Sequence, residues 1–392
     1  MLENIALVQF FLYEAKDLET GIADTAATTL LIDMNIRVAA DDPADSTPDV
    51  ATELRKRLRF DQKKRPYVDA LLLSHPDKDH ISGLAKHFWL GSLDDYPDDN
   101  LQWHEKRIVI REMWSSPMVF RRRSKHHTLC LDAVAFNKEV HRRIGLWRTL
   151  RSAVEGDRIK IMGEDEKGKT DDLLPIVIKT GEKFTQINGE PSFLFSAHLL
   201  APAPLQDDDT EEMLSKNHSS VILNIELQAS IYSSKRVRFL TGGDAEVAIW
   251  KRLWEKYEDT PEVLEYDLLQ APHHCSWHSL SVDSWSTYGN DAELCLEARN
   301  ALGQAREGAT IVASSKKILD NDDNPPCIRA KREYLSILRP VDGIFHCTGD
   351  GKRPETIEFE ITSTGVSKIF AGVAAGVGAS AVASAAPRAG RT

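Results

Sequence analysis

The stretch Ser74–Gly83, SHPDKDHISG, decides the fold, because four side chains that can bind metal fall within six of its residues. These side chains are His75, Asp77, Asp79 and His80. Imidazole nitrogen and carboxylate oxygen suit Zn²⁺, and carboxylate-rich sites also accept Mn²⁺. The apolar run Tyr67–Leu73 comes directly before the stretch and predicts a buried strand. A rigid strand end holds ligands in place, so we favour a metal site over a solvated turn, which the proline and acids would also suit.

Two further apolar runs end in residues of the same chemistry. Lys235–Leu240 leads through Thr-Gly-Gly to Asp244, and Leu264–Gln270 ends just before His273 and His274. The two glycines before Asp244 let the backbone pass close to its neighbours there. We expect the three strand ends to converge on one edge, with Asp244 bridging two ions.

The remaining periodicity predicts a mixed α/β protein. Strands are expected where β-branched and aromatic residues recur, and helices where apolar residues repeat every three or four positions. The expected strands are Ile5–Tyr13, Thr28–Asp33, Pro175–Lys179, Pro191–Leu199, Ser220–Leu227, Thr310–Ser314, Gly343–His346 and Thr356–Ile361. The expected helices are Val50–Phe60, Leu84–Leu90, Ala133–Val154 and Asp244–Tyr257, and 94–174 is otherwise expected to be irregular. Strands in both halves, with helices between and after them, predict two packed sheets with helices outside.

These motifs resemble a known family. SHPDKDHISG is similar to the HxHxDH motif of metallo-β-lactamase-fold hydrolases. With Asp77 in the place of the middle histidine, it most resembles the hydrolase domain of the DNA-uptake protein ComEC. Four other segments, spread between Ile5 and Ile361, resemble motifs of that branch in the same order. They are Leu31–Asn35 ("LIDxG"), Asn217–Leu223 ("NNxSLVL"), Thr241–Glu246 ("TGDAE") and Pro272–Ser276 ("HHGS").

The resemblance implies a four-layer αββα sandwich with two divalent metal ions, zinc or manganese, at one edge. One ion would be held by His75, Asp77 and Asp244, and the other by Asp79, His80, His273 and Asp244. Many relatives have a further histidine before the bridging aspartate. His218 is the nearest counterpart and is expected in or beside the metal shell, with His198 as another choice.

The sequence departs from the family pattern at three places. Thr241–Asp244 contains one glycine more than the motif, Cys275 replaces the glycine of "HHGS", and Asn35 replaces the glycine after Asp33. Asparagine tolerates positive φ better than most residues, so the last change is mild. The Cys275 thiol is expected to be buried and inert rather than a redox sensor.

A strongly basic segment spans 106–151, where twelve lysines and arginines stand against three acids, a net charge of +9. The whole chain of 392 residues carries −11. One interpretation is a phosphate-binding flank for nucleic acid beside the metal site. The other is a surface that pairs with the acids of the chain itself.

The bulk composition predicts a cytoplasmic protein. The five cysteines form no CxxC pair, and the first residues lack the basic flank and cleavage site of a signal peptide. We expect a hydrolase domain over 1–365, with a basic insertion near 94–174, and an Ala/Gly-rich tail over 366–392. Ile369–Pro387 is long enough to span a bilayer but poor in large apolar residues, so a linker is favoured over a membrane anchor.

The expected activity is metal-dependent hydrolysis of a phosphodiester or of nucleic acid, as a nuclease performs it, through a hydroxide held by two metal ions. Asp79 and Asp244 would act through the metals, and His274 would bind the phosphate or assist the leaving group. Two alternatives stay open. One is a hydrolase of a small ester, lactone or thioester with the same fold, which has no need of the basic segment. The other is a non-catalytic binding or signalling module, which the full ligand set opposes.

Overall fold

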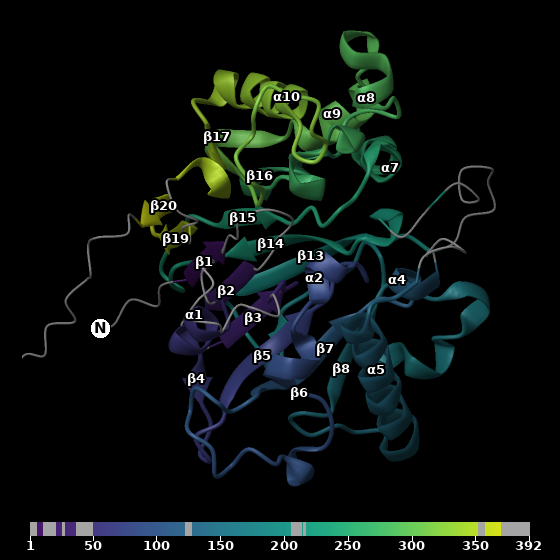
Figure 1. The fold of residues 1–392 in the computed structure, drawn as a ribbon, viewed down its shortest axis with the longest axis vertical. Coiled ribbons are helices and arrows are strands. Elements are labelled where there is room, and N and C mark those ends of the chain that lie inside the picture. Colours follow the sequence, from purple (N-terminus) through teal and green to yellow (C-terminus); the bar gives the residue numbers. More distant parts are fainter. Residues whose placement is uncertain are drawn as a thin grey trace, which may run out of the picture.

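The computed structural model describes residues 6–10, 21–25, 28–36, 50–121, 128–204, 214, 217–351 and 357–369. Within these ranges the chain forms two large sheets and a small two-stranded one (Figure 1). The basic-segment residues 122–127 and most of the expected tail, 370–392, lie outside the described residues.

The first sheet combines antiparallel and parallel strands in the order β20-β19-β1-β2-β3-β5-β7-β8-β9, with β4 beside β5 and β6 beside β7. The pairing is parallel from β3 to β9, so those strands end at one edge. The bounds are β1 (Ala6–Phe10), β2 (Gly21–Thr25), β3 (Thr28–Ile32), β4 (Arg59–Phe60), β5 (Pro66–Leu72), β6 (Phe88–Trp89), β7 (Ile108–Ser115), β8 (Arg158–Met162), β9 (Val177–Ile178), β19 (Ile357–Thr362) and β20 (Gly365–Ile369).

The second sheet has the order β10-β13-β14-β15-β16-β17-β18 and is parallel from β15 to β18. Its strands are β10 (Lys183–Phe184), β13 (Phe195–Ala201), β14 (Ile222–Leu227), β15 (Val237–Leu240), β16 (Tyr266–Gln270), β17 (Ala305–Ala313) and β18 (Ile344–Cys347). The small sheet pairs β11 (Gln186–Ile187) with β12 (Glu190–Pro191).

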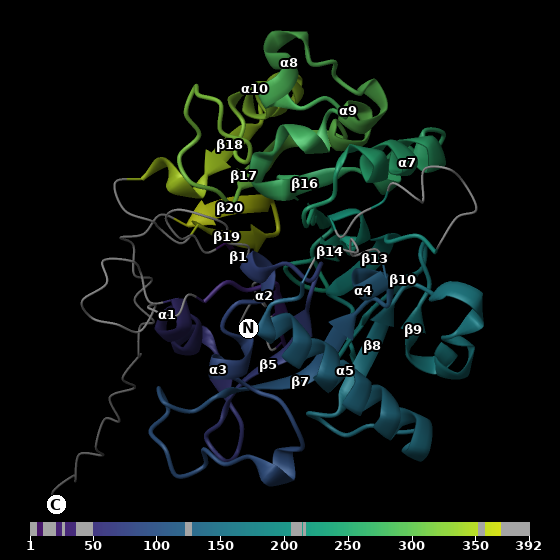
Figure 2. The ribbon, with the colours of Figure 1, turned by 45° about the vertical axis from the view of Figure 1, so that its right-hand side comes forward.

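Helices cover the outer faces of both sheets. Their bounds are α1 (Val50–Arg57), α2 (Lys78–Ile81), α3 (Leu84–His87), α4 (Met118–Arg121), α5 (Leu131–Leu150), α7 (Val247–Tyr257), α8 (Trp285–Tyr288), α9 (Leu296–Leu302) and α10 (Ile328–Leu338). Short 3₁₀ turns at η4 (Asn217–Ser219) and η6 (Pro272–Cys275) carry site residues. Figure 2 shows α7, α9 and α10 in the upper half of the molecule and α1 and α5 in the lower half.

Three buried apolar clusters hold the layers together. The central one joins the sheets face to face, for example Leu72 of β5 with Phe239 of β15. A second packs α1 and α5 on the first sheet, and a third packs α7, α9 and α10 on the second. In α7, for instance, Trp250 and Leu253 lie one helical turn apart and face the sheet. The αββα sandwich expected from the sequence is therefore confirmed.

Several element predictions need correction. The segment 94–174 is not irregular, because it contributes β7 and β8 to the first sheet. The helix expected over Val50–Phe60 ends at Arg57, and the chain then enters β4. The helix expected from Asp244 begins at Val247, which leaves Asp244 on a loop. The strand Gly21–Thr25 and helices α9 and α10 were not expected, and residues 366–369 of the expected tail belong to β20. No helix in the described ranges is long and apolar enough to cross a membrane.

Candidate metal centre

The predicted ligands meet where parallel strands of both sheets end. The loop after β5 carries His75 to His80, the loop after β15 carries Asp244, and η6 after β16 carries His273 and His274. Backbone hydrogen bonds tie the loops together, since His273 N donates to Gly243 O at 2.8 Å. The strand ends thus converge on one edge, as the sequence predicts.

The first group of ligand atoms comes from His75, Asp77 and Asp244, and the atoms lie within 4.8 Å of one another. His75 Nε2 is 3.8 Å from Asp77 Oδ2 and 3.3 Å from Asp244 Oδ2. All three residues are buried. One imidazole nitrogen and two carboxylates provide a donor set for a divalent ion.

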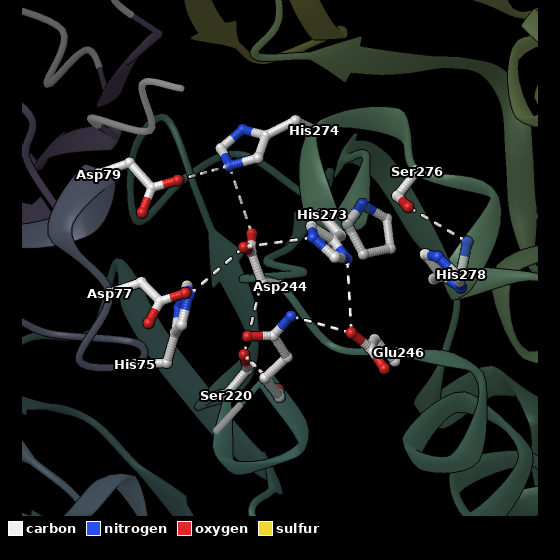
Figure 3. A network of polar contacts seen from close by, with 12 residues as sticks. His75, Asp77, Asp79, Ser220, Asp244, Glu246, His273, His274, Ser276 and His278 are labelled. Carbon is white, nitrogen blue, oxygen red and sulfur yellow. Dashed lines mark hydrogen bonds and ion pairs between the residues drawn. The ribbon is translucent and has the colours of Figure 1, made fainter. Parts of the chain in front are cut away.

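The second group comes from Asp79, His80, His274 and Asp244, again within 4.8 Å of one another. Asp244 Oδ1 lies 3.3 Å from His80 Nε2 and 3.5 Å from His274 Nε2. His274 Nε2 is 3.7 Å from Asp79 Oδ2 (Figure 3). Two imidazoles and two carboxylates complete a four-donor set.

Asp244 belongs to both groups, and Figure 3 shows it between His75, His273 and His274. One of its oxygens faces His75 and the other faces His80 and His274. Burial alone would raise the pKa of Asp244, but the surrounding histidines hold that pKa well below its ordinary value. Asp244 is therefore a carboxylate with an oxygen available to each ion, the geometry that a bridging ligand needs.

The three histidines of these groups are each fixed through the other ring nitrogen. His75 Nδ1 lies 3.1 Å from Ser74 Oγ, and His274 Nδ1 lies 3.0 Å from the carbonyl oxygen of Ser314. His80 Nδ1 lies 2.9 Å from Asp33 Oδ2. Each ring thus presents Nε2 to the carboxylates, the arrangement that outer partners impose on metal-binding histidines.

The residues present fit a pair of cations. His75 Nε2 and Asp244 Oδ1 are buried and make no hydrogen bond with any described residue. Buried polar atoms almost always have a partner, and an ion would supply it here. The acids and histidines of the two groups also place several negative charges in one buried space, which cations would balance.

Asp33, at the end of β3, is a site residue that sequence reasoning used only as part of the "LIDxG" resemblance. It is fully buried and accepts hydrogen bonds from Ser74 N and Ser74 Oγ as well as facing His80. Burial opposes charge on His80, but the Asp244 and Asp33 carboxylates outweigh it and raise the pKa of His80 well above its ordinary value. Asp33 could have been identified from its position, because it ends an expected strand, and a second expected strand leads to the histidine motif.

The positions of the two histidines of η6 differ from the roles expected from the sequence. His274, expected to contact substrate, lies in the second group of ligand atoms. His273, expected as a ligand, lies outside both groups and outside the third group found in the described residues, which is Asp33, His75 and His80. His273 Nε2 is 3.8 Å from Asp244 Oδ2, and its Nδ1 is 3.8 Å from Glu246 Oε1. Burial lowers the pKa of His273 to about 4, although Asp244 opposes that shift.

The backbone of η6 explains why this assignment is hard to read from sequence. His273, His274 and Cys275 have φ values of 50°, 53° and 68°, so three side-chain-bearing residues in a row are left-handed. A left-handed conformation costs about 1–2 kcal/mol for each such residue. At Cys275 this cost falls at the position where the HHGS motif has glycine. Burial raises the pKa of the Cys275 thiol well above its ordinary value, as an inert cysteine requires.

The extra glycine of Thr241–Asp244 also has a structural reason. A Cβ on Gly242 would lie 2.8 Å from the backbone of both Gln270 and Pro272. Only glycine lets the loops after β15 and β16 approach this closely. Their contact brings Asp244 to His274.

His218 lies beside the centre and not within its groups of ligand atoms. Its Nε2 is 3.5 Å from Glu246 Oε2, and Asn217 Nδ2 donates to Glu246 Oε1 at 2.9 Å. Glu246 thus faces both His218 and His273. His198, the other choice for the further histidine, lies on β13, and its Nε2 is 3.0 Å from Gly181 O.

Six arginines of the basic segment pair with acids of the chain itself. They form ion pairs at these distances: Arg107–Asp98 2.7 Å, Arg111–Asp69 3.0 Å, Arg121–Asp165 2.9 Å, Arg142–Glu139 2.7 Å, Arg143–Glu139 2.8 Å and Arg148–Asp172 2.7 Å. The Arg143–Glu139 pair is buried. His126 and His127 lie outside the described residues. The pairing interpretation of the segment therefore has direct contacts behind it, and nucleic-acid binding stays a prediction.

Comparison with known proteins finds similarity in structure but not in sequence. No known family profile and no curated protein matches the sequence. The fold is similar to that of the metallo-beta-lactamase fold protein YhfI from Bacillus subtilis, with a TM-score of 0.38 and 12% identity over 91% of this chain and 100% of that one. A similarity this low carries no information on activity, and the layers and topology described above establish the fold class.

Proposed function

We propose that the protein is a metal-dependent hydrolase with two ions at the centre described above. The observation that carries this proposal is the pair of ligand groups that share Asp244, with the Nε2 atoms of His75, His80 and His274 directed at its carboxylate. Zn²⁺ suits this mixture of nitrogen and oxygen donors, and Mn²⁺ is the second choice. A full donor set also opposes a non-catalytic module.

Each residue of the centre has a distinct task in this proposal. Divalent ions at the two sites would supply Lewis-acid activation of the substrate and of the attacking water. Asp33 and Ser314 hold the rings of His80 and His274 so that their Nε2 atoms face inward. His273 takes the substrate-contacting task first expected of His274, because it lies beside Asp244 without belonging to either ligand group.

The open side of the centre supports a task for His273 and its neighbours. The side chains of Asp79 and His273 are 25% and 14% exposed, whereas those of His75, His80 and His274 are almost fully buried. In this proposal substrate reaches the centre on the side of Asp79 and His273. His273 would bind a non-bridging oxygen or give a proton to the leaving group.

The substrate class we favour is a phosphodiester, with nucleic acid as the macromolecular candidate. Paired ions suit in-line displacement at phosphorus because they stabilise both the attacking and leaving oxygens. The second candidate is a small ester, lactone or thioester, which has no need of the basic segment, whose Arg121 and Arg148 are paired with acids of the chain.

A substrate panel with metal-loaded protein tests the proposal. Bis(4-nitrophenyl) phosphate, single- and double-stranded DNA, RNA, a lactone and a thioester would be assayed with wild type, Asp244→Asn and the matched control Asp322→Asn, whose carboxylate is exposed. We expect phosphodiester turnover in wild type and the control alone. Turnover of the lactone or thioester only would select the second candidate, and no metal binding after loading with Zn²⁺ or Mn²⁺ would overturn both.

A further inference from the structure

A cavity of about 490 Å³ lies between α5, the loop after β7, and the segment after β8. Its volume falls within the range of small-molecule sites. It is separate from the ligand groups of the metal centre, since none of their residues lines it. It has no task in the hydrolytic chemistry described above.

The cavity lies close to the metal centre in the topology. It begins at the carboxyl end of β7, which pairs in parallel with β5, the strand that leads to His75. Leu73 N donates to Trp114 O at 3.3 Å, so the backbone before Ser115 adjoins the backbone before His75. On its other side α4, which also lines the cavity, packs against η4, the turn that contains His218. A molecule in the cavity would therefore lie beside the metal-binding edge.

The wall of the cavity combines apolar and polar side chains. Val140, Ile144 and Ile161 supply aliphatic surface. Ser115 and Asn137 add a hydroxyl and an amide to the same lining. A ligand that carries donors and acceptors could form hydrogen bonds with both. A saturated acyl chain could form none.

The rim of the cavity is basic. Arg121 and Arg148 line it and are paired with Asp165 and Asp172. The Arg148–Asp172 pair is about half exposed, with side chains 48% and 44% accessible. Exposed pairs of this kind contribute about 0–1 kcal/mol, so a phosphate could replace the carboxylate at little cost.

We propose that this cavity binds a nucleotide unit, with the base on the apolar wall near Ser115 and Asn137 and the phosphate at Arg121 and Arg148. The proposal rests on phosphodiester hydrolysis as the function, and it makes the cavity the subsite for a nucleotide next to the bond that is cut. It narrows the substrate class to nucleotide-containing phosphodiesters.

Direct binding tests the subsite separately from turnover. Isothermal titration calorimetry with the full-length, metal-loaded protein would use AMP and UMP as probes, with decanoate as the acyl comparison. Asn137→Asp keeps the side-chain shape but sets a negative charge on the wall, and we expect it to weaken AMP binding at least about tenfold. Asn290→Asp, at an exposed position, is the matched control and should bind as wild type does.

Two further comparisons decide the location of the ligand and the class. Asp244→Asn should retain AMP binding, because the cavity contains no metal ligand. Binding lost in Asp244→Asn but kept in Asn137→Asp would place AMP at the metal centre and overturn the subsite. Decanoate bound in place of AMP, or neither bound, would overturn it as well. Hydrolysis of bis(4-nitrophenyl) phosphate by wild type reports on the proposed function whichever of these results is obtained.

Discussion

The metal-binding edge and the basic segment concentrate charge in opposite ways. At the edge, Asp77, Asp79 and Asp244 face histidines, and buried ligand atoms such as His75 Nε2 have no hydrogen-bond partner among the described residues. In the basic segment, six arginines have carboxylates of the chain within ion-pair distance, including Asp69, Asp98 and Glu139. The first region has ligand atoms that cations could bind, whereas six arginines of the second are paired with acids of the chain.

The difference shows that local charge in a sequence does not report function until its partners are known. In the sequence the edge is only a few acids and histidines, yet its buried atoms His75 Nε2 and Asp244 Oδ1 make no hydrogen bond with a described residue, which burial makes costly. The segment stands out in the sequence with a net charge of +9, yet six of its described arginines pair with acids of the chain. Buried polar atoms without hydrogen-bond partners indicate a functional site better than net charge does.

Replacement of Asp244 should have the largest effect of all. Asp244→Asn removes the charge shared by both ligand groups, so we expect turnover to fall by about a thousandfold or more, roughly 4 kcal/mol, while the fold survives. Metal analysis and kcat on a generic phosphodiester would be measured together, with Asp322→Asn as control. A folded variant with near-wild-type turnover would show that turnover does not depend on a carboxylate shared by the two ligand groups.

In the basic segment the largest effect should come from Glu139. Its carboxylate pairs with Arg143, and both side chains are almost fully buried, at 4% and 1% exposure. Glu139→Gln leaves a buried guanidinium uncompensated, which should lower the free energy of unfolding by about 3–5 kcal/mol. Urea denaturation of the variant, wild type and the exposed control Glu258→Gln measures the effect. If the free energy of unfolding falls no more than in the control, the Glu139–Arg143 pair does not stabilise the segment.

The same pair predicts a pH dependence. Burial opposes ionisation of Glu139, but Arg142 and Arg143 outweigh it and hold the pKa of this carboxyl below its ordinary value. A lowered folded-state pKa stabilises the protein above the unfolded value of about 4.3, and the stabilisation is lost as pH falls through the folded pKa. The stability gap between wild type and Glu139→Gln should therefore be full at pH 7 and narrow only below about pH 4.

The two histidines of η6 should separate metal binding from substrate contact. His274→Ala removes a member of the second ligand group and should weaken binding of one ion about a hundredfold. His273→Ala should keep both ions and lower kcat instead. Equilibrium dialysis with Zn²⁺ and steady-state kinetics would be run beside the exposed control His104→Ala. The reverse pattern would restore the assignment first expected from the sequence.

The sequence was sufficient for the architecture and for where the ligands meet. The buried strand Tyr67–Leu73 and the runs before Asp244 and His273 are close to β5, β15 and β16 as the structure has them. Continuous apolar runs predict buried parallel strands, and parallel strands end together. For that reason alone, ligands far apart in the chain could be expected at one edge.

The finer arrangement could not be read from the residues. Which of two adjacent histidines faces the centre depends on the left-handed backbone of η6, and nothing in the residues PHHC sets those dihedral angles. β7, with the sequence IVIREMWS, is hidden among polar neighbours. The partners of the arginines lie far along the chain: Arg121 and Asp165 are 44 residues apart. Packing decides each of these, and local pattern does not.

The smallest effect should follow loss of a single exposed arginine of the basic segment. Arg121 is 38% exposed and pairs with Asp165 at 2.9 Å, so Arg121→Ala should lower the free energy of unfolding by less than about 1 kcal/mol. If Arg121 also reaches a nucleic-acid phosphate, the slope of log K against log salt should flatten by about 0.7–0.9 in the variant. Titrations with single-stranded DNA at several salt concentrations, beside thermal melts, measure both quantities. A flattened slope would mean that Arg121 leaves Asp165 to contact a phosphate of the bound DNA. The basic segment would then take part in substrate binding. An unchanged slope with a slightly lowered melting temperature would leave this arginine purely structural and move the preferred substrate towards a small ester.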